Sequence, residues 1–326
     1  MDAAAKIAVL GAGAWGTALA IQAARAGNAV SLWTRDPGRA RTLATSRENA
    51  AYLPGQALPA AITVTADAGA ALEDAAFALL AIPLQHLRAT LPATSLPLVA
   101  CAKGVEAGTG FLPLELLADA RPEAELALLS GPNFAHEIAA GLPAATLVAS
   151  RNAALRTLVA ARLGSAGFRL YGSEDTLGAQ VGGAAKNVIA IAAGAVTGAG
   201  LGENARAALI TRGLAELARL TVALGGKAET AAGLSGLGDL LLTATGPGSR
   251  NTALGMDLGR GLDLQAALAR RKGVVEGVAT APAIVARAAS AGVELPICAA
   301  VADLLAGHLT LAQSIARLMA RPPRDE

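Results

Sequence analysis

The stretch Lys6-Ile7-Ala8-Val9-Leu10-Gly11-Ala12-Gly13-Ala14-Trp15-Gly16 joins a short apolar run to a G-x-G-x-x-G pattern, and an alanine-rich stretch follows it. The apolar run predicts a buried strand, and the alanine-rich stretch predicts a helix. In such a turn Gly11 permits the sharp bend, Gly13 lets the backbone approach a pyrophosphate, and Gly16 lets the helix lie against the strand. A second apolar run at residues 29–33 completes a βαβ unit, so the pattern predicts a dinucleotide-binding turn.

The composition limits the classes of function that remain. A chain of 326 residues with 53% hydrophobic side chains can bury the cores of about two domains. A net charge of +2, no long basic run and 2% aromatic residues give no basis for binding nucleic acid. Cys101 and Cys298 are too isolated to predict a disulfide framework or a metal site. A reducing cytoplasm is the expected location.

One apolar segment, residues 181–201, is long enough to be considered as a membrane span. It is built from small residues and contains Lys186 and Asn187, which a bilayer disfavours. We expect a buried core helix there and no membrane span. The glycines near the N-terminus interrupt its apolar run, so no secretory signal is predicted.

The pattern of elements changes near residue 175. Before that point, apolar runs typical of strands alternate with helical stretches, which predicts a doubly wound, Rossmann-like α/β sheet. The expected strands are residues 6–10, 29–33, 62–65, 77–82, 96–101, 126–129, 145–148 and 168–171. After that point, almost every segment has a helical pattern. The sequence therefore predicts a dinucleotide-binding domain at residues 1–175 and an all-helical substrate and catalytic domain at residues 176–326.

Ligands in doubly wound sheets bind at the carboxyl ends of the strands, so the residues that follow each strand are candidates. Arg35 and Asp36 follow the second strand, where an arginine can hold a 2′-phosphate and an acidic residue can bind the ribose hydroxyls. Arg35 favours NADP over NAD. Lys103 follows a later strand, where it is either a substrate contact or a surface lysine. Asn133 is expected mainly to cap the helix that begins beside it.

Two isolated charges stand out in the helical region. Lys186 is the one ionisable residue between Asp175 and Glu203, and Asp239 is the one between Glu229 and Arg250. A lysine in a segment of small residues either reaches out of the core along its apolar stem or serves a site, and the site is favoured. A buried carboxylate needs a cation, so we expect Asp239 to pair with Lys186; the alternative for Asp239 is a helix cap.

Two further segments carry polar side chains suited to ligands. Ser249, Arg250 and Asn251 combine an arginine fork, an amide and a hydroxyl at an expected helix start, which predicts an anion pocket. Glu276 lies in the glycine-flanked segment 273–277, where it could bind a cofactor amide or hydroxyl or merely turn the chain.

Seven short motifs in one order make the chain recognisable. They are Gly11-Ala12-Gly13-Ala14-Trp15-Gly16-Thr17, Ala102-Lys103-Gly104, Ser130-Gly131-Pro132-Asn133-Phe134-Ala135, Lys186-Asn187, Gly236-Leu237-Gly238-Asp239, Ser249-Arg250-Asn251 and Val275-Glu276-Gly277. From Lys6 to about Glu294 the chain resembles the NAD(P)-dependent glycerol-3-phosphate dehydrogenases of the bacterial type. The resemblance implies reversible reduction of dihydroxyacetone phosphate to sn-glycerol 3-phosphate, the precursor of glycerophospholipids, by a cytoplasmic homodimer.

The resemblance also assigns roles to residues at matching positions. Lys186 matches the catalytic lysine, and Lys103 and Asp239 match residues that line the substrate and assist catalysis. The other substrate positions are Gly131, Asn133, Ser249, Arg250 and Asn251. The cofactor positions are Gly11, Gly13, Ala14, Trp15, Gly16, Arg35, Lys103, Ala135, Arg250, Val274 and Glu276. Departures from the family pattern occur at Ala14, Asn133 and His136, where serine, serine or threonine, and lysine are usual.

The chemistry that follows is a hydride transfer with Lys186 as the proton donor. Lys103 would stabilise the developing alkoxide and lower the pKa of Lys186, and Asp239 would orient it. Two alternatives remain at this stage. One is a related two-domain reductase of the β-hydroxyacid or ketopantoate type, against which the Ser249-Arg250-Asn251 segment argues. The other is a non-catalytic dinucleotide sensor, which has no need of a proton donor.

Overall fold

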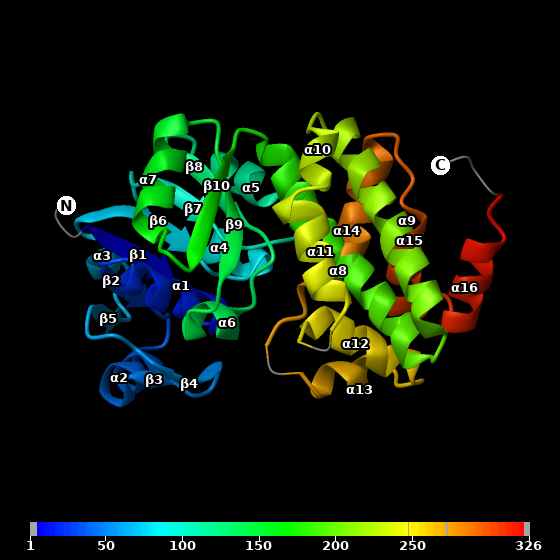
Figure 1. Ribbon diagram of the computed structural model, residues 1–326, viewed down its shortest axis with the longest axis horizontal. Helices are drawn as coiled ribbons and strands as arrows, with labels where there is room; N and C mark the ends of the chain where they lie inside the picture. Colours follow the sequence, from blue (N-terminus) through cyan, green and yellow to red (C-terminus); the bar gives the residue numbers. More distant parts are fainter. Residues whose placement is uncertain (1–4, 247, 272, 323–326) are drawn as a thin grey trace. The chain divides into compact units, whose positions relative to one another are not determined.

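The first strand of the chain lies within an eight-stranded sheet. The computed structural model describes residues 5–246, 248–271 and 273–322, and within them this sheet has the order β10-β9-β8-β7-β6-β1-β2-β5 (Figure 1). The strands are β1 (Lys6–Leu10), β2 (Ala29–Trp33), β5 (Ile62–Thr65), β6 (Ala75–Leu80), β7 (Leu98–Ala100), β8 (Leu126–Ser130), β9 (Ala144–Ala149) and β10 (Phe168–Ser173). Neighbours pair in parallel except β8 and β9, which are antiparallel. The predicted doubly wound sheet is confirmed.

Five of the predicted strands have different bounds in the structure, and three of them, β8, β9 and β10, are only one or two residues longer than predicted. The strand predicted at residues 77–82 spans Ala75–Leu80, because Ile82 is buried against Gly11 instead of continuing the ladder. The strand predicted at 96–101 shortens to Leu98–Ala100, since Pro97 has no N–H to donate to a ladder. The structure also adds a small hairpin of β3 (Glu48–Asn49) and β4 (Leu53–Ala57), which the sequence analysis missed.

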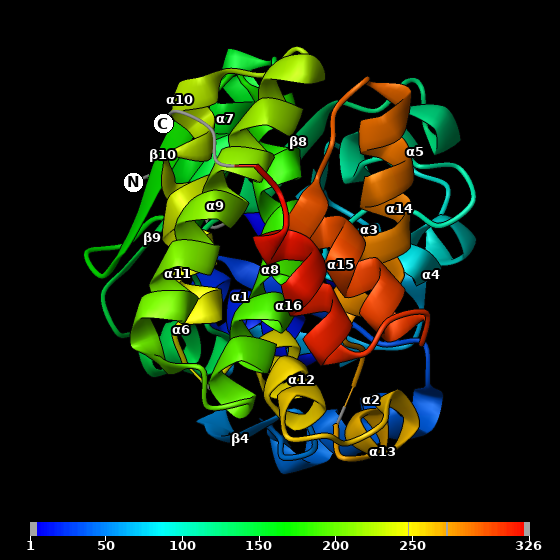
Figure 2. The ribbon, with the colours of Figure 1, turned by 90° about the vertical axis from the view of Figure 1, so that its right-hand side faces the viewer.

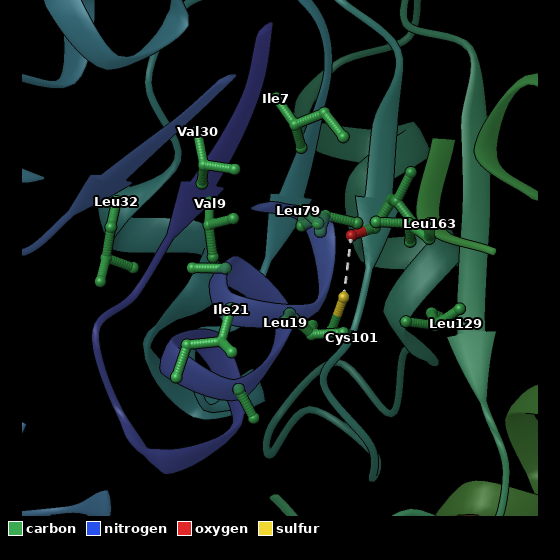
Figure 3. Packing of buried hydrophobic residues seen from close by; sticks show 14 of the residues in the cluster. Ile7, Val9, Leu19, Ile21, Val30, Leu32, Leu79, Cys101, Leu129 and Leu163 are labelled. Carbon is green, nitrogen blue, oxygen red and sulfur yellow. Dashed lines mark hydrogen bonds between the residues drawn. The ribbon is translucent and has the colours of Figure 1, made fainter. Parts of the chain in front are cut away.

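Helices cover both faces of the sheet (Figure 1). They are α1 (Ala14–Arg25), α2 (Pro37–Ser46), α3 (Ala68–Leu72), α4 (Leu84–Thr90), α5 (Pro113–Ala120), α6 (Ala135–Ala140) and α7 (Ala153–Leu163). Helix α1 packs with α6 and α7, while α3 packs on β1, β2 and β6. Figure 3 shows Ile7 and Val9 of β1 in the same buried cluster as Leu19 and Ile21 of α1. Burial on both faces explains why these strands are continuous apolar runs.

The rest of the described chain is helical. Its elements are α8 (Thr176–Gly198), α9 (Gly202–Ala223), α10 (Ala228–Ala231), the π-helical turn η1 (Leu234–Gly238), α11 (Asp239–Ala244), α12 (Arg250–Gly259), α13 (Leu264–Ala269), α14 (Glu276–Ser290), α15 (Pro296–Leu305) and α16 (Leu311–Met319). Figure 2 shows α8 among α9, α11, α12 and α15. Helix α8 is long and apolar enough to span a membrane, but 89% of its most apolar window is buried within the protein.

Contacts group the chain into two units. The first comprises residues 5–103 and 113–179, and the second comprises Gly104–Leu112 together with residues 180–322. The short segment Gly104–Leu112 therefore belongs with the helices although it follows a strand of the sheet. The division at residues 175 and 176 remains a prediction of where the two domains separate.

A buried carboxylate caps one helix of the second unit from another. Glu216 of α9 is 3% exposed and accepts hydrogen bonds from the N–H groups of Ile297 (2.6 Å) and Cys298 (3.3 Å) at the start of α15. Burial raises the pKa of Glu216 above its usual value. Burial and the neighbouring Glu216 carboxylate raise the pKa of the Cys298 thiol. Burial raises the pKa of Cys101 to about 12. Both cysteines therefore remain neutral thiols at pH 7.

The close contact of α1 with β1 can be tested at Gly16. A Cβ there would lie 1.8 Å from the carbonyl oxygen of Gly11, so we expect Gly16→Ala to lower the free energy of unfolding by about 3 kcal/mol. Gly13→Ala is the matched control, because its Cβ would meet no heavy atom within 4 Å and its φ of −72° suits alanine. Chemical denaturation measures both variants. Equal losses would contradict the close contact of helix and strand.

Candidate active site

The glycine turn after β1 has the geometry of a phosphate-binding loop. Gly11 has φ of +113°, and a Cβ on it would lie 2.5 Å from the carbonyl oxygen of Ala81. Helix α1 then begins at Ala14 with Gly13 as its N-cap, and no side chain caps its first N–H groups. The space beside Gly13 is open, so protein packing gives no reason for a glycine there. A pyrophosphate that approaches the helix N-terminus would explain the glycine at this position. The turn therefore fits a dinucleotide.

Two residues that the sequence analysis missed support this turn. The Asn49 amide donates hydrogen bonds to the carbonyl oxygen of Ala12 (2.9 Å) and to Oγ1 of Thr17 (2.7 Å). The guanidinium of Arg39 donates to the same carbonyl and lies 4.4 Å above the ring of Tyr52. The carbonyl of Ala12 is thus satisfied by protein donors. No sequence signal pointed to Asn49, because the β3–β4 hairpin that carries it was not predicted.

The structure separates the roles of Arg35 and Asp36 at the end of β2. Asp36 is the N-cap of α2, where its Oδ1 accepts hydrogen bonds from the N–H groups of Gly38 (2.8 Å) and Arg39 (3.3 Å). A carboxylate committed to a helix cap is a poor ribose ligand. Arg35 is exposed at the same strand end.

Lys103 and Gly131 meet at the same edge of the sheet. The Nζ atom of Lys103 donates to the carbonyl oxygen of Gly131, 3.3 Å away. The expectation that Asn133 caps a helix is wrong: α6 begins at Ala135, its N-cap is Phe134, and no side chain caps it. The chain is still extended at Phe134, so the helix starts beyond the reach of Asn133. Oδ1 of Asn133 is buried and finds no hydrogen-bond partner among the described residues.

The remaining positions that we expect to contact the cofactor in this unit lie on the first turns of two packed helices. Ala14 and Trp15 begin α1, and Ala135 begins α6, which packs against α1. Trp15 and Ala135 both pack against the hydrophobic core, so their backbones are fixed.

In the second unit, the expected pairing of the two isolated charges is confirmed. Nζ of Lys186 lies 2.8 Å from Oδ1 of Asp239 and 2.8 Å from Oγ1 of Thr243. Lys186 is 8% exposed and Asp239 is 1% exposed. Asp239 does not N-cap α11: it is the first residue of this helix, and the N-cap position is Gly238. Thr243, one turn after Asp239, is a partner that the sequence analysis did not single out.

Glycines bring these two charges together. Gly182 lies one turn before Lys186 on α8, and a Cβ on it would be 2.4 Å from the carbonyl oxygen of Ser235 in η1. Position 236 of η1 also requires a glycine, because a Cβ on Gly236 would lie 2.0 Å from the carbonyl oxygen of Ala231. The π-helical turn runs directly into Asp239, and such turns are often found at functional sites.

The three residues of the expected anion pocket lie at the start of α12. Ser249 is the N-cap of this helix and accepts a hydrogen bond from the N–H of Thr252 (3.4 Å), which confirms the predicted helix start. Arg250 is exposed on the first turn, whereas Asn251 is buried. The Asn251 amide donates to Oδ1 of Asn187 (2.9 Å) and accepts from the N–H of Gly277 (3.0 Å). Asn251 is therefore held mainly by the protein itself.

Asn187 links this helix to the segment that carries Glu276. Its Nδ2 atom donates to Oε2 of Glu276 at 3.4 Å, while its Oδ1 atom accepts from Asn251. Glu276 begins α14, and Val274 is 41% exposed just before it. Residues next to Lys186, at the start of α12 and at the start of α14 thus form one hydrogen-bonded network. No local sequence pattern indicated this role for Asn187.

The N-terminal and C-terminal halves of the chain each match a model of the same protein family. Residues 6–156 match the NAD-dependent glycerol-3-phosphate dehydrogenase N-terminus, and residues 175–316 match its C-terminus. A glycerol-3-phosphate dehydrogenase (NAD(P)+) of Acidiphilium cryptum is 54% identical over 331 residues, covering 100% of both chains. One from Rhodospirillum rubrum is 49% identical and covers 98% of this chain and 93% of its own.

Solved structures agree with this assignment. The crystal structure of glycerol-3-phosphate dehydrogenase from Coxiella burnetii has a TM-score of 0.93 and 36% identity, and it covers 98% of this chain and 99% of its own. The Plasmodium falciparum enzyme of the same name shares the fold at a TM-score of 0.86 and 19% identity, over 99% and 98% of the two chains. The glycine turn, the buried lysine and both family models lead to one conclusion: the chain belongs to the NAD-dependent glycerol-3-phosphate dehydrogenase family.

Proposed function

We propose that this chain catalyses the reversible NAD(P)H-dependent reduction of dihydroxyacetone phosphate to sn-glycerol 3-phosphate, which feeds glycerophospholipid synthesis. The observation that carries the proposal is the buried ammonium of Lys186, which Asp239 and Thr243 hold at 2.8 Å each. A neighbouring carboxylate favours the protonated lysine, which is the form that a carbonyl reduction needs. A protein that only sensed a dinucleotide would have no use for this group.

The proposed chemistry divides between the two units. The first unit binds NAD(P)H, which supplies a hydride to the carbonyl carbon of the substrate. As negative charge develops on the carbonyl oxygen, Lys186 donates a proton from Nζ and becomes neutral. Asp239 orients this amine through the contact at 2.8 Å and favours its return to the ammonium form. In the reverse direction, neutral Lys186 accepts the proton of the hydroxyl group.

The substrate phosphate is assigned to the start of α12. Arg250 offers a planar fork of donors there, and the first N–H groups of the helix favour an anion. The proposed substrate contacts are Lys103, Gly131, Asn133, Lys186, Asp239, Ser249, Arg250 and Asn251. Because Asn251 is held by Asn187 and Gly277, its contribution is mainly to fix the clamp.

The cofactor is assigned to the glycine turn and to positions on later segments of both units. The proposed contacts are Gly11, Gly13, Ala14, Trp15, Gly16, Arg35, Lys103, Ala135, Arg250, Val274 and Glu276. We propose that Arg35 gives a preference for NADP over NAD, since Asp36 is committed to its helix cap. The two buried, free cysteines suit a reducing cytoplasm, and the family resemblance supports a homodimer.

The proposal is tested by adding dihydroxyacetone phosphate to the protein with NADPH or NADH and following cofactor oxidation. We expect turnover with the phosphorylated substrate and little with 2-ketopantoate or unphosphorylated dihydroxyacetone. Cofactor binding without turnover would favour the sensor, and turnover with 2-ketopantoate would favour the related reductase.

Arg35→Ala tests the cofactor preference. We expect the Kd for NADPH to rise about tenfold or more while the Kd for NADH changes little, because a charged hydrogen bond to a phosphate is worth about 1.5–3 kcal/mol. Fluorescence titration with each cofactor gives both constants. Arg39→Ala is the matched control: it removes a brace of the glycine turn and should weaken both cofactors alike. Equal losses of affinity for NADPH and NADH in Arg35→Ala would contradict the proposed contact of Arg35 with the 2′-phosphate.

Replacing Lys186 tests the proton donor. Lys186→Ala should lower kcat by about 10²-fold or more and leave cofactor affinity unchanged. It also leaves Asp239 without the ammonium that neutralises it, which can cost about 3–5 kcal/mol of stability. The double variant Lys186→Met with Asp239→Asn removes both charges and separates the two effects. If this folded double variant kept turnover within a few-fold of wild type, Lys186 would not be the proton donor.

Arg250→Lys tests the phosphate clamp. We expect KM for dihydroxyacetone phosphate to rise sharply and kcat to fall, because an ammonium cannot reproduce the bidentate fork that orients the substrate. The residual activity with unphosphorylated dihydroxyacetone should change little. The measurement is kcat/KM for both substrates in wild type and variant. A similar fractional loss with each substrate would mean that Arg250 serves the fold or the cofactor instead.

A further inference from the structure

Another buried carboxylate of the helical unit has no place in the proposed chemistry. Asp257 lies near the end of α12, and its side chain is 3% exposed. Burying a carboxylate is costly unless cations neutralise it. Three arginines surround this one: Arg271 forms an ion pair with Oδ2, Arg270 lies 3.0 Å from Oδ1, and Arg260 lies 3.6 Å from Oδ1.

The three arginines differ in where they lie on the chain. Arg260 is the C-cap of α12 itself and is 54% exposed, so its contact with Asp257 stays within one helix end. Arg270 is the C-cap of α13, and Arg271 follows it at the start of the connection to α14. Arg271 is 16% exposed and also donates a hydrogen bond to the carbonyl oxygen of Ala253 on α12 (2.5 Å). Arg271 therefore ties the start of this connection to α12 twice.

The connection that Arg271 begins leads to two proposed cofactor contacts. Val274 lies within it, and Glu276 begins α14 at its end. Its far end is tied to the same helix, because the N–H of Gly277 donates to Oδ1 of Asn251. Between the two ends, a Cβ on Gly273 would lie 3.0 Å from Nη1 of Arg250, so the backbone passes close to the proposed clamp. Helix α12 thus holds both ends of the connection and carries Arg250.

We propose that Asp257 and Arg271 form a positioning pair that holds Arg271 against α12 and thereby favours the positions of Val274 and Glu276 that bind the dinucleotide. The pair touches neither substrate nor cofactor. It acts by holding Arg271 against α12, which places Val274 and Glu276. Without the carboxylate, three guanidinium groups would repel one another at one point, and Arg271 would move away from α12. This inference rests on the proposed function only in taking Val274 and Glu276 as cofactor contacts.

The test compares NADPH binding by wild type, Asp257→Asn, Arg271→Gln and Arg260→Gln. If the connection keeps its binding conformation for about one-fifth of the time after the pair is broken, the Kd for NADPH rises about fivefold. We expect this rise in Asp257→Asn and in Arg271→Gln, with kcat at saturating NADPH within about twofold of wild type, since the pair sets occupancy of the site and not the chemical step. Arg260→Gln is the matched control and should bind NADPH like wild type.

Two further variants keep the test decisive. The double variant Asp257→Asn with Arg271→Gln should bind NADPH like either single variant, because both single changes break the same Asp257–Arg271 ion pair. Arg271→Lys retains a charge opposite Asp257 and should recover part of the affinity. If Asp257→Asn does not fold, the two Arg271 variants carry the same comparison. An unchanged Kd in folded Arg271→Gln, or an equal rise in Arg260→Gln, would overturn the proposal.

Binding is measured without substrate, so the inference and the proposed function can fail separately. Wild type that binds NADPH but does not reduce dihydroxyacetone phosphate would overturn the proposed function and leave the comparison of Kd values intact. Wild type that reduces dihydroxyacetone phosphate while both pair variants bind NADPH normally would overturn the inference alone.

Discussion

The ion pair of Lys186 and Asp239 constrains the whole helical unit. Each group is nearly inaccessible to water, and either charge alone would cost several kcal/mol to bury. The pair is stable only if α8 and α11 hold the two side chains at hydrogen-bond distance. Gly182 meets this requirement by letting the backbone of η1 approach α8 one turn before Lys186. The buried ion pair therefore requires a small residue one turn away on α8.

The same principle extends along α8 to α12. A Cβ on Gly194 or Gly198 would overlap the backbone of α12, and a Cβ on Gly255 or Gly259 would overlap the backbone of α8. The two helices pack backbone to backbone, with glycines four residues apart on each. This close contact carries the start of α12 to Asn187, where Asn251 completes a network that reaches Glu276. The position of the proposed phosphate clamp thus follows from helix packing rather than from the clamp residues themselves.

In the first unit, the parallel sheet gathers candidate residues because the strands of its central part all end at one edge. Gly11, Arg35, Lys103 and Gly131 follow four different strands and share that edge. The antiparallel step between β8 and β9 means that the last two strands end on the opposite side. Candidate residues therefore come from the strands before that step.

Much of this protein was determined by its sequence alone. The glycine turn, the two charges isolated among small residues and the helix start at Ser249 depend on local patterns, and each was predicted from the residues before any contact was known. Local patterns carry this information because strand, helix and turn propensities act over a few residues. The family resemblance rests on the same short motifs.

Other features were decided only by tertiary structure. Asn133 looked like a helix cap, but the extended chain at Phe134 moves the helix beyond it. No sequence signal identified Asn49, Thr243 or Asp257, since the partners of these side chains lie on other elements of the fold. Glu216 resembles any surface glutamate of a helix, yet it caps α15 from 81 residues away. A sequence pattern reports what neighbours along the chain require, whereas burial and charge pairing depend on residues that only folding brings together.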